Sequence, residues 1–288
     1  MKLSIITINY NNAAGLRRTL DSVAAQRLDG AEQAEATLEV EHIIIDGNSA
    51  DGSVNVIRDY DALNSSSENP LVVSWSSEPD NGIYNAMNKG IKRASGDYIQ
   101  ILNSGDILAS DDVVEKMLAA IETNHNPDFI YGNMVKKDYS SGTVIGKSEK
   151  VEYSLRQYYS STMNHDCCYI SRGLYEKYGL YDESLKIVSD WKWFLQAIGM
   201  GDVRPVYVDI DVTIFDASGI SETNMELRDR ERRRVLEEIL PSAVLNDYDS
   251  HAFDMEQMDR LRRHKMYWIA YLVERVLFKM EKWGILRK

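Results

Sequence analysis

The chain has 288 residues, of which 44% are apolar and 27% are charged, the balance of an ordinary globular protein that can bury a core. Its 33 Lys and Arg against 45 Asp and Glu leave a net charge of −12, which argues against a general nucleic-acid binder, because such proteins carry a basic surface. The longest apolar run, Met266–Val273, is far shorter than the roughly 18 residues of a membrane-spanning helix. The sequence therefore predicts one large domain, or one domain with an appendage, and no transmembrane helix.

The N-terminus reads as a buried first strand, because its short apolar stretch runs directly into Asn11 and Asn12 with no small-residue cleavage site. A signal peptide is therefore not expected, and the expected location is the cytoplasm. Cys167 and Cys168 are adjacent, a spacing that fits neither a disulfide framework nor a zinc site. They are expected to be reduced packing residues.

Runs rich in β-branched residues alternate with helical periodicity up to about residue 132, a pattern typical of an α/β domain with a mostly parallel sheet flanked by helices. The expected strands are Leu3–Ile8, Val40–Ile45, Leu71–Trp75, Tyr98–Leu102 and Phe129–Tyr131. The expected helices are Leu16–Gln26, Ser53–Leu63, Ile83–Ala94 and Asp111–Thr123.

The second half is less regular. A hairpin is expected with its turn at Ser140–Gly142, followed by a Tyr-rich segment and a helix near Asp190–Ile198. From residue 222 the chain becomes charged and helical, with a break at Pro241 and a final helix over Asp254–Trp283.

The common phosphate-binding loops are missing from the sequence. No G-x-G-x-x-G follows the first expected strand, where Asn9–Gly15 stand instead, so a dinucleotide-binding site is not expected. The segment Gly142–Ser148 is one residue short of a P-loop and follows a hairpin turn rather than joining a strand to a helix, so it is interpreted as a coincidence.

Polar clusters follow four of the expected strands, at the edge where open α/β sheets bind ligands. The clusters are Thr7–Asn11, Asp46–Gly52, Glu78–Tyr84 and Asn103–Asp106. Each cluster alone is also what turns and helix caps are made of. Together they indicate an acidic rim at one sheet edge, and oxygen ligands of this kind suit magnesium or manganese.

These clusters and their order resemble the family-2 glycosyltransferases, enzymes with the GT-A nucleotide-sugar-binding fold. The matching blocks are SIITINYNN, IIIDGNSADGS, SEPDNGIYNAMNKGIKRASGDYIQILNSGD and SDWKWFL. The resemblance runs from about Lys2 to Ser221. It implies a GT-A domain over residues 1–221, with a nucleotide-binding half (1–132) and an acceptor-binding half (133–221), and a helical C-terminal extension over residues 222–288.

The resemblance also implies which residues hold the donor. Thr7, Asn9 and Asp46 would lie at the base and ribose, Asp80 near the uracil or the diphosphate, and Lys89 and Asn103 on the same nucleotide-sugar side. For Asp46 the alternative is a cap of the following turn, and for Lys89 it is a solvated lysine on a helix face.

The metal motif of the family has two or more acidic residues, whereas the matching stretch here, Asn103–Asp106, keeps only one carboxylate. Asp106 would therefore bind Mn²⁺ or Mg²⁺ with help from the diphosphate, from water and from Asn103. The cation would neutralise the charge that grows on the leaving nucleoside diphosphate. The alternative for Asp106 is a helix cap, although Ser110 and Asp111 are better placed for that role.

Asp190 occupies the position of the family's catalytic base, and the resemblance implies that it takes the proton of an acceptor hydroxyl during a single inverting displacement. Its alternative is a helix cap, and one residue can do both. His165 and Trp191 are expected on the acceptor side. The aromatic cluster around them can stack on sugar rings or form core, and spacing does not separate the two. That cluster comprises Tyr153, Tyr158, Tyr159, Trp191 and Trp193.

Near the C-terminus, apolar residues recur at three- and four-residue steps and form one helical stripe beside a basic face. From Glu256 to Lys288 there are nine Lys and Arg against four Asp and Glu, a local charge of +5. Such a helix can lie on the inner face of the cytoplasmic membrane, or pack on its own domain or on a second subunit as a homodimer.

The sequence therefore predicts an inverting, metal-assisted transferase that moves one sugar from a nucleotide sugar, with a UDP-sugar as the expected donor, to a glycan or lipid-linked acceptor in surface polysaccharide synthesis. One rival is a sugar-nucleotide pyrophosphorylase, which would need a Gly-rich phosphate loop where Asn9–Asn12 stand. The other is a non-catalytic glycan- or nucleotide-binding scaffold with a degenerate metal motif.

Overall fold

The computed structural model of the chain describes residues 1–28, 39–67, 70–138, 142–148, 150–151, 154–216, 224–264 and 266–283. The strands are β1 (Lys2–Asn9), β2 (Glu39–Asp46), β3 (Val72–Ser77), β4 (Tyr98–Ile101), β5 (Ile107–Leu108), β6 (Phe129–Asp138), β7 (Thr143–Lys147), β8 (Cys168–Ser171) and β9 (Val206–Asp216). The helices are α1 (Ala13–Ala24), α2 (Ser53–Ser65), α3 (Ile83–Arg93), α4 (Val113–Thr123), α5 (Leu155–Ser160), α6 (Arg172–Tyr178), α7 (Ser189–Phe194), α9 (Met225–Ile239), α10 (Ser242–Arg263) and α11 (Tyr267–Lys282).

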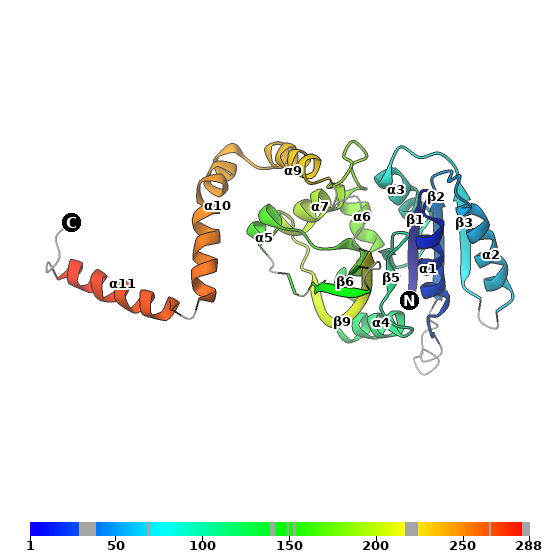
Figure 1. Cartoon of the computed structure of the whole chain (residues 1–288), viewed down its shortest axis with the longest axis horizontal. Coiled ribbons are helices and arrows are strands. Elements are labelled where there is room, and N and C mark those ends of the chain that lie inside the picture. Colours follow the sequence, from blue (N-terminus) through cyan, green and yellow to red (C-terminus); the bar gives the residue numbers. More distant parts are fainter. Residues whose placement is uncertain are drawn as a thin grey trace. The chain divides into compact units, whose positions relative to one another are not determined.

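In the described residues the strands form one mixed sheet of nine, in the order β3-β2-β1-β4-β8-β6-β9-β5, with β7 paired to β6 (Figure 1). The first four strands in this order are parallel, as the βαβ alternation predicts. Beyond β4 the sheet is mixed, because β8 runs antiparallel to β4 and to β6, whereas β6 and β9 are parallel. The mostly parallel character therefore holds for the N-terminal half of the sheet.

Helices cover both faces of the parallel half. Leu16 and Leu20 of α1 pack with Ile57 of α2 on Ile44 of β2, so these two helices cover one face. Ile44 pairs with Thr7 of β1, so these two side chains share a face, and the adjacent residue of β1, Ile6, points the other way, toward α3. A Cβ built on Gly90 of α3 would lie 2.3 Å from Ile6 Cγ2, which explains why a glycine stands where this helix crosses β1.

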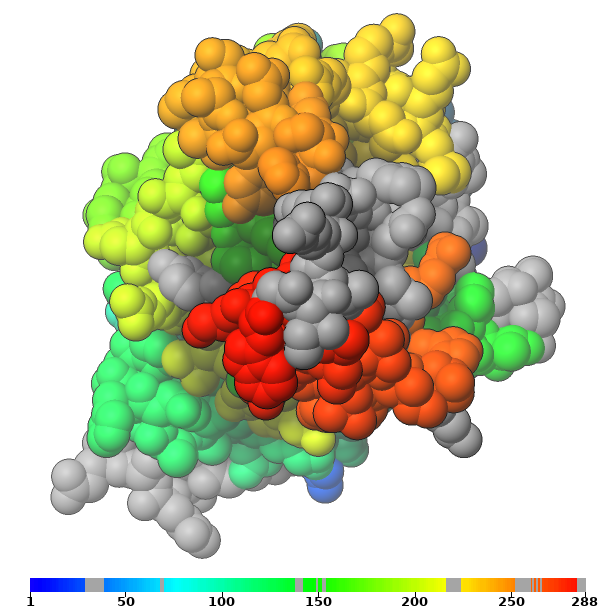
Figure 2. Space-filling view, turned by 90° about the vertical axis from the view of Figure 1, so that its left-hand side faces the viewer, coloured from blue at the N-terminus to red at the C-terminus, as the bar shows by residue number. Residues whose placement is uncertain are grey.

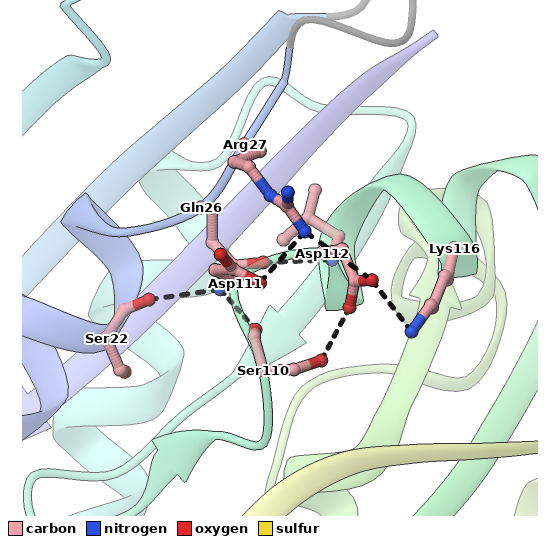
Figure 3. A network of polar contacts seen from close by, with 8 residues as sticks. Ser22, Gln26, Arg27, Ser110, Asp111, Asp112 and Lys116 are labelled. Carbon is pink, nitrogen blue, oxygen red and sulfur yellow. Dashed lines mark hydrogen bonds and ion pairs between the residues drawn. The ribbon is translucent and has the colours of Figure 1, made fainter.

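A polar network ties α1 to the start of α4 and fixes the chain that leaves the loop after β4 (Figure 3). Gln26 Oε1 accepts from the backbone N–H of Val114, and Arg27 pairs with Asp111 at 3.1 Å. Asp112, the residue before α4, pairs with Lys116 at 2.8 Å. These contacts hold α4 beside the C-terminal end of α1.

All five expected strands and four expected helices of the first half are confirmed, with shifted ends. The expected hairpin is confirmed by the antiparallel pairing of β6 and β7, while residues 139–141 of its turn lie outside the described residues. Gly142–Ser148 includes β7, an edge strand, and so does not form a phosphate loop. The expected helix Asp190–Ile198 is α7 followed by one π-helical turn, Leu195–Gly199.

Pro241 separates α9 from α10, as expected. The single final helix expected over Asp254–Trp283 is wrong: its first residues belong to α10, and α11 begins only at Tyr267 after a break around residue 264. The charged sequence continues smoothly through this point, so helical periodicity alone gives no stop signal there.

The chain divides into two compact units, Met1–Arg234 and Val235–Lys288. The sequence-based boundary, between residues 221 and 222, falls in the stretch 217–223, which lies outside the described residues. The assignment of a nucleotide-binding half and an acceptor-binding half stays a prediction. In the part of the chain that the structure describes, no helix is both long enough and apolar enough to cross a bilayer.

Candidate active site

A cavity of about 900 Å³ opens where the parallel strands end. Loops after β1, β2, β3 and β4 contribute to its wall, together with the segment before α7 and the end of β9. The residues that line it are Ile8, Asn9, Tyr10, Asn12, Gly47, Asn48, Pro79, Asp80, Gly82, Ile83, Tyr84, Ala86, Asn103, Ser104, Gly105, Asp106, Lys186, Ile187 and Phe215. The convergence expected of the four polar clusters therefore occurs.

Asn9 lines the cavity, and Asp46 lies directly behind it. Asn9 Nδ2 donates to Asp46 Oδ1 at 2.7 Å, and Asp46 Oδ2 accepts from the Ser49 N–H at 2.9 Å and from the Ser77 hydroxyl at 2.6 Å. Burial raises the pKa of Asp46, but hydrogen bonds from Ser49 and Ser77 outweigh it, so the pKa lies below its ordinary value. Asp46 is fully buried and not a lining residue, and the cap contact to Ser49 that the sequence leaves open is present.

The fixed amide of Asn9 leaves one atom without a partner. Because Nδ2 faces the Asp46 carboxylate, Oδ1 must be the other amide atom, and it makes no hydrogen bond in the described residues although it is buried. A buried acceptor without a donor costs free energy. Its position in the cavity wall therefore suits a ligand that carries an N–H or O–H group.

Asp80 follows β3 and also lines the cavity. Its Oδ1 accepts from the N–H of Gly82, the residue before α3, at 2.9 Å. A Cβ on Gly47 would lie 2.6 Å from Asp80 Oδ2, so a side chain at position 47 would displace the Asp80 carboxylate from its present position. Asp80 therefore reaches the cavity as expected.

The loop Asn103–Asp106 is hydrogen-bonded to Thr19 of α1. Thr19 Oγ1 donates to the carbonyl of Asp106 at 2.7 Å and accepts from the N–H of Gly105 at 2.9 Å. Gly105 has a φ of +113°, a conformation that favours glycine. Both Asn103 and Asp106 line the cavity. Asp106, which carries the single carboxylate of this loop, is largely buried.

Asp190 lies at the start of α7 and is bound from two sides. Its Oδ1 accepts from the Tyr84 hydroxyl at 2.9 Å, and its Oδ2 lies 3.0 Å from His165 Nδ1. His165 Nε2 in turn lies 3.0 Å from Asn103 Nδ2. These four residues form a continuous polar relay, named here the Tyr84–Asn103 relay, whose two ends are cavity-lining residues.

The charged forms of Asp190 and His165 are favoured in the middle of this relay. Burial raises the pKa of Asp190, but the hydrogen bond and charge of His165 outweigh it and lower the pKa below its ordinary value. Burial lowers the pKa of His165, whereas the hydrogen bond and charge of Asp190 raise it more, so the net shift is upward. Burial, and then the charge of Asp190, raises the pKa of Tyr84 well above its ordinary value, so Tyr84 remains a neutral donor.

Six expected site residues do not line the cavity. Asp46, Asp190 and His165 each lie within hydrogen-bond distance of a lining side chain, whereas Thr7, Lys89 and Trp191 do not. Thr7 points to the α1–α2 face, because it alternates with Ile6 along β1, and contacts His42, whose pKa burial lowers to about 3. Lys89 binds the carbonyl of Pro79 at 3.0 Å and pairs with an exposed glutamate of the same loop. Trp191 is 1% exposed and donates to a backbone carbonyl of α5, so the geometry gives no support to an acceptor-side role.

Two further residues of the aromatic cluster are also core residues rather than cavity residues. Tyr158 and Trp193 are buried in the core with Trp191, and Trp193 donates to the Gly179 carbonyl at 2.8 Å. Tyr153 lies outside the described residues. Two polar residues of the wall, Tyr84 and Lys186, have no expected role, although Tyr84 ends one of the four polar clusters. A lone lysine in an ordinary position gives no signal of its own.

The sequence matches the family described as Glycosyl transferase family 2 over residues 4–179. It is 32% identical over 220 residues to an uncharacterised glycosyltransferase of Mycobacterium tuberculosis, covering 76% of each chain. It is 24% identical to the PGL/p-HBAD biosynthesis glycosyltransferase of Mycobacterium bovis, covering 76% of this chain and 79% of that one.

Solved structures show the same fold. Staphylococcus aureus TarS 1–349 in complex with UDP-GlcNAc has a TM-score of 0.60 at 20% identity, over 78% of this chain and 61% of that one. The mannosyltransferase PcManGT from Pyrobaculum calidifontis, in complex with GDP-Man and Mn²⁺, has a TM-score of 0.56 at 16% identity, over 80% of this chain and 60% of that one. This chain therefore spans less than two thirds of both solved chains.

The ligand cavity at the ends of parallel strands and the mixed sheet define a GT-A fold. The chain belongs to glycosyltransferase family 2. It is thus an enzyme of the glycosyltransferase class, and neither the pyrophosphorylase nor the scaffold alternative agrees with this membership.

Proposed function

We propose that the protein transfers one sugar from a nucleotide sugar to an acceptor hydroxyl with inversion, and that Asp190 is the general base. The observation that carries the proposal is the relay in which Asp190 is fixed between Tyr84 and His165 beside the cavity. A carboxylate with a lowered pKa is ionised at neutral pH and is ready to accept a proton.

The donor half of the cavity supports a nucleotide sugar. Asn9 offers a buried, unpartnered acceptor, and Asp80 offers a carboxylate. Both suit the imide N–H of uracil or the hydroxyls of ribose, and a UDP-sugar is the proposed donor. The solved relatives include complexes with UDP-GlcNAc and with GDP-Man, so guanine remains the alternative base to test.

A divalent cation is part of the proposal, and the loop Asn103–Asp106 offers it a small set of oxygen ligands. In the described ranges no three His, Cys, Asp or Glu side chains gather into a metal site. Magnesium in proteins is often held by one or two carboxylates, with substrate phosphates and water completing its shell. Asp106 fits that limited role, with Asn103 Oδ1 as a second oxygen that has no partner among the described residues.

In the proposed reaction the acceptor hydroxyl attacks the anomeric carbon from the side opposite the diphosphate, and its proton passes to Asp190. His165 holds one carboxylate oxygen and Tyr84 holds the other, so the carboxylate keeps one orientation. A cation at Asp106 would neutralise the charge of the departing nucleoside diphosphate.

The experiment is calorimetric titration of UDP and GDP into the protein, with manganese and with EDTA, repeated on Asp106→Ala. We expect one nucleotide to bind more tightly with manganese, and this gain to disappear in the variant. If neither nucleotide binds under any condition, the proposed donor site is wrong. The nucleotide that binds then decides which nucleotide sugars are screened for hydrolysis and transfer.

The second unit supports a proposal about the acceptor. The apolar side chains of α11 are exposed, including Trp268 (69%), Leu272 (59%) and Val276 (56%), and Figure 2 shows this helix, in red, at the surface. The stretch 256–288 has nine Lys and Arg against four Asp and Glu, although the whole chain is acidic. We propose that α11 lies on an anionic membrane and that the acceptor is a lipid-linked glycan. A homodimer through α11 is the alternative that the vesicle experiment described below tests.

A further inference from the structure

Lys186 lies in the segment before α7 and is the only Lys or Arg among the described residues that line the cavity. Its ammonium group makes no hydrogen bond and no ion pair with any described residue. It faces the start of α3, because a Cβ built on Gly82 would lie 3.8 Å from Lys186 Nζ. The absence of a side chain at Gly82 therefore leaves the space around this ammonium group open to the cavity.

The backbone that carries Lys186 is held in place. Glu231 of α9 accepts from the N–H of Lys186 at 2.8 Å and from the N–H of Ile187 at 2.9 Å. The Glu231 side chain is largely buried, and Arg232, the next residue, stacks its guanidinium 5.0 Å from the ring centre of Trp191. The backbone at Lys186 and Ile187 is thus fixed to α9, and this contact positions the Lys186 side chain in the cavity wall.

The charges around the cavity explain why a cation is needed there. Asp80 and Asp106 both contribute carboxylates to the wall, and the chain as a whole has a charge of −12. A diphosphate that enters this cavity meets these negative groups, and its own charge grows when the glycosidic bond breaks. The stretch Asn103–Asp106 offers a metal ion only one carboxylate, so a positively charged side chain in the wall would add to the charge that such an ion supplies.

We propose that Lys186 binds the diphosphate of the nucleotide sugar and stabilises the leaving group through its ammonium donors. A lysine ammonium is a compact charge with three donors, which suits phosphate oxygens. This inference depends on the proposed function, because it assumes that the cavity holds a nucleoside diphosphate. It adds a protein-borne cation that acts whether or not a metal ion is bound.

The test compares diphosphate binding with nucleoside binding in Lys186→Gln, which removes the charge and keeps much of the length. UDP and GDP are titrated by calorimetry in manganese and in EDTA, and uridine and guanosine are titrated by ligand-observed NMR. Lys177→Gln is the matched control, because Lys177 pairs with Asp202 outside the cavity and its loss changes the net charge equally. Lys186→Arg keeps the charge, and thermal unfolding of each variant checks the fold.

We expect Lys186→Gln to weaken binding of the diphosphate by about tenfold to a hundredfold in both conditions, the range for a hydrogen bond to a charged group. Nucleoside binding should not change, Lys177→Gln should match the wild type, and Lys186→Arg should retain most of the affinity. Equal diphosphate affinity in Lys186→Gln and wild type overturns the inference alone, as does an equal loss for nucleosides. If the wild type binds neither UDP nor GDP, the proposed function fails and this inference fails with it.

Discussion

Replacing Asp190 with asparagine separates the proposed chemistry of this carboxylate from its part in the fold. Asparagine has the same shape, and the Tyr84 hydroxyl can still donate to its amide oxygen. On the other side, the new amide N–H faces His165 Nδ1, which must then accept, so the imidazole proton moves to Nε2. Asn103 has to turn its amide to accept that proton, a change that its unpartnered Oδ1 allows. The hydrogen bonds of the relay can thus survive while its charge is lost.

The expected magnitudes follow from this geometry. A hydrogen bond to a charged group contributes about 1.5–3 kcal/mol and a neutral one about 0.5–1.5, so Asp190→Asn should lower the free energy of unfolding by about 1 kcal/mol. For a unit of this size that corresponds to a fall in melting temperature of about 2–4 °C. The rate of sugar transfer should fall by about 10²- to 10⁴-fold, because an amide cannot accept the proton.

The assay measures release of the nucleoside diphosphate from the donor sugar in the presence of acceptor, beside calorimetry of the nucleotide and thermal unfolding. Asp182→Asn is the matched control, because Asp182 is a partly exposed carboxylate that accepts from Lys192 at 2.9 Å outside the relay. It should lose stability but keep its rate. A transfer rate in Asp190→Asn within threefold of wild type, with normal nucleotide binding, would refute the assignment of Asp190 as the base.

Three further outcomes are expected. His165→Phe removes the partner that lowers the pKa of Asp190, so the acidic limb of the pH–rate profile should move to higher pH; an unmoved limb means that the limb does not report Asp190. Gly90→Ala places a methyl group against Ile6 and should cost about 1–3 kcal/mol of unfolding free energy, whereas Gly146→Ala, with nothing within 4 Å, should be neutral in the same melts. Truncation before α11 should abolish sedimentation with anionic vesicles but leave nucleotide binding intact; unchanged sedimentation, together with loss of a dimer, would assign α11 to self-association.

The parallel half of the fold could be predicted because each strand there is a continuous buried run followed by a helical stretch. β9 is not among the expected strands, although its sequence from Val208 to Ile214 alternates apolar and polar residues in the way a half-buried strand does. β8 has only four residues, and a run this short gives no periodic signal. The mixed order of the second half depends on long-range pairing, which no local pattern encodes.

The site residues that could be predicted are those that a loop after a strand delivers to the sheet edge, such as Asn9 and Asp80. Thr7 does not line the cavity, because it lies within β1, where strand alternation decides the face, and its face is covered by α1 and α2. Asp46 lies at the predicted edge of the sheet, but its carboxylate accepts hydrogen bonds from Ser49 and Ser77 and does not face the cavity. Lys186 could not be found, since its location depends on α9, which is distant in the sequence.

The departure at position 103 of the acidic motif follows from the relay. Asn103 Nδ2 lies 3.0 Å from His165 Nε2, so a carboxylate here would place His165 between two negative groups, with Asp106 close enough to add to the effect. Asn103→Asp should therefore raise the pKa of His165 further, and it should also give manganese a second carboxylate ligand. The measurement is an NMR titration of the His165 ring protons, with manganese affinity measured by calorimetry in the presence of the nucleotide that binds. Tighter manganese binding with an unchanged His165 pKa would show that position 103 serves the metal alone, and that the asparagine is not needed to tune the relay.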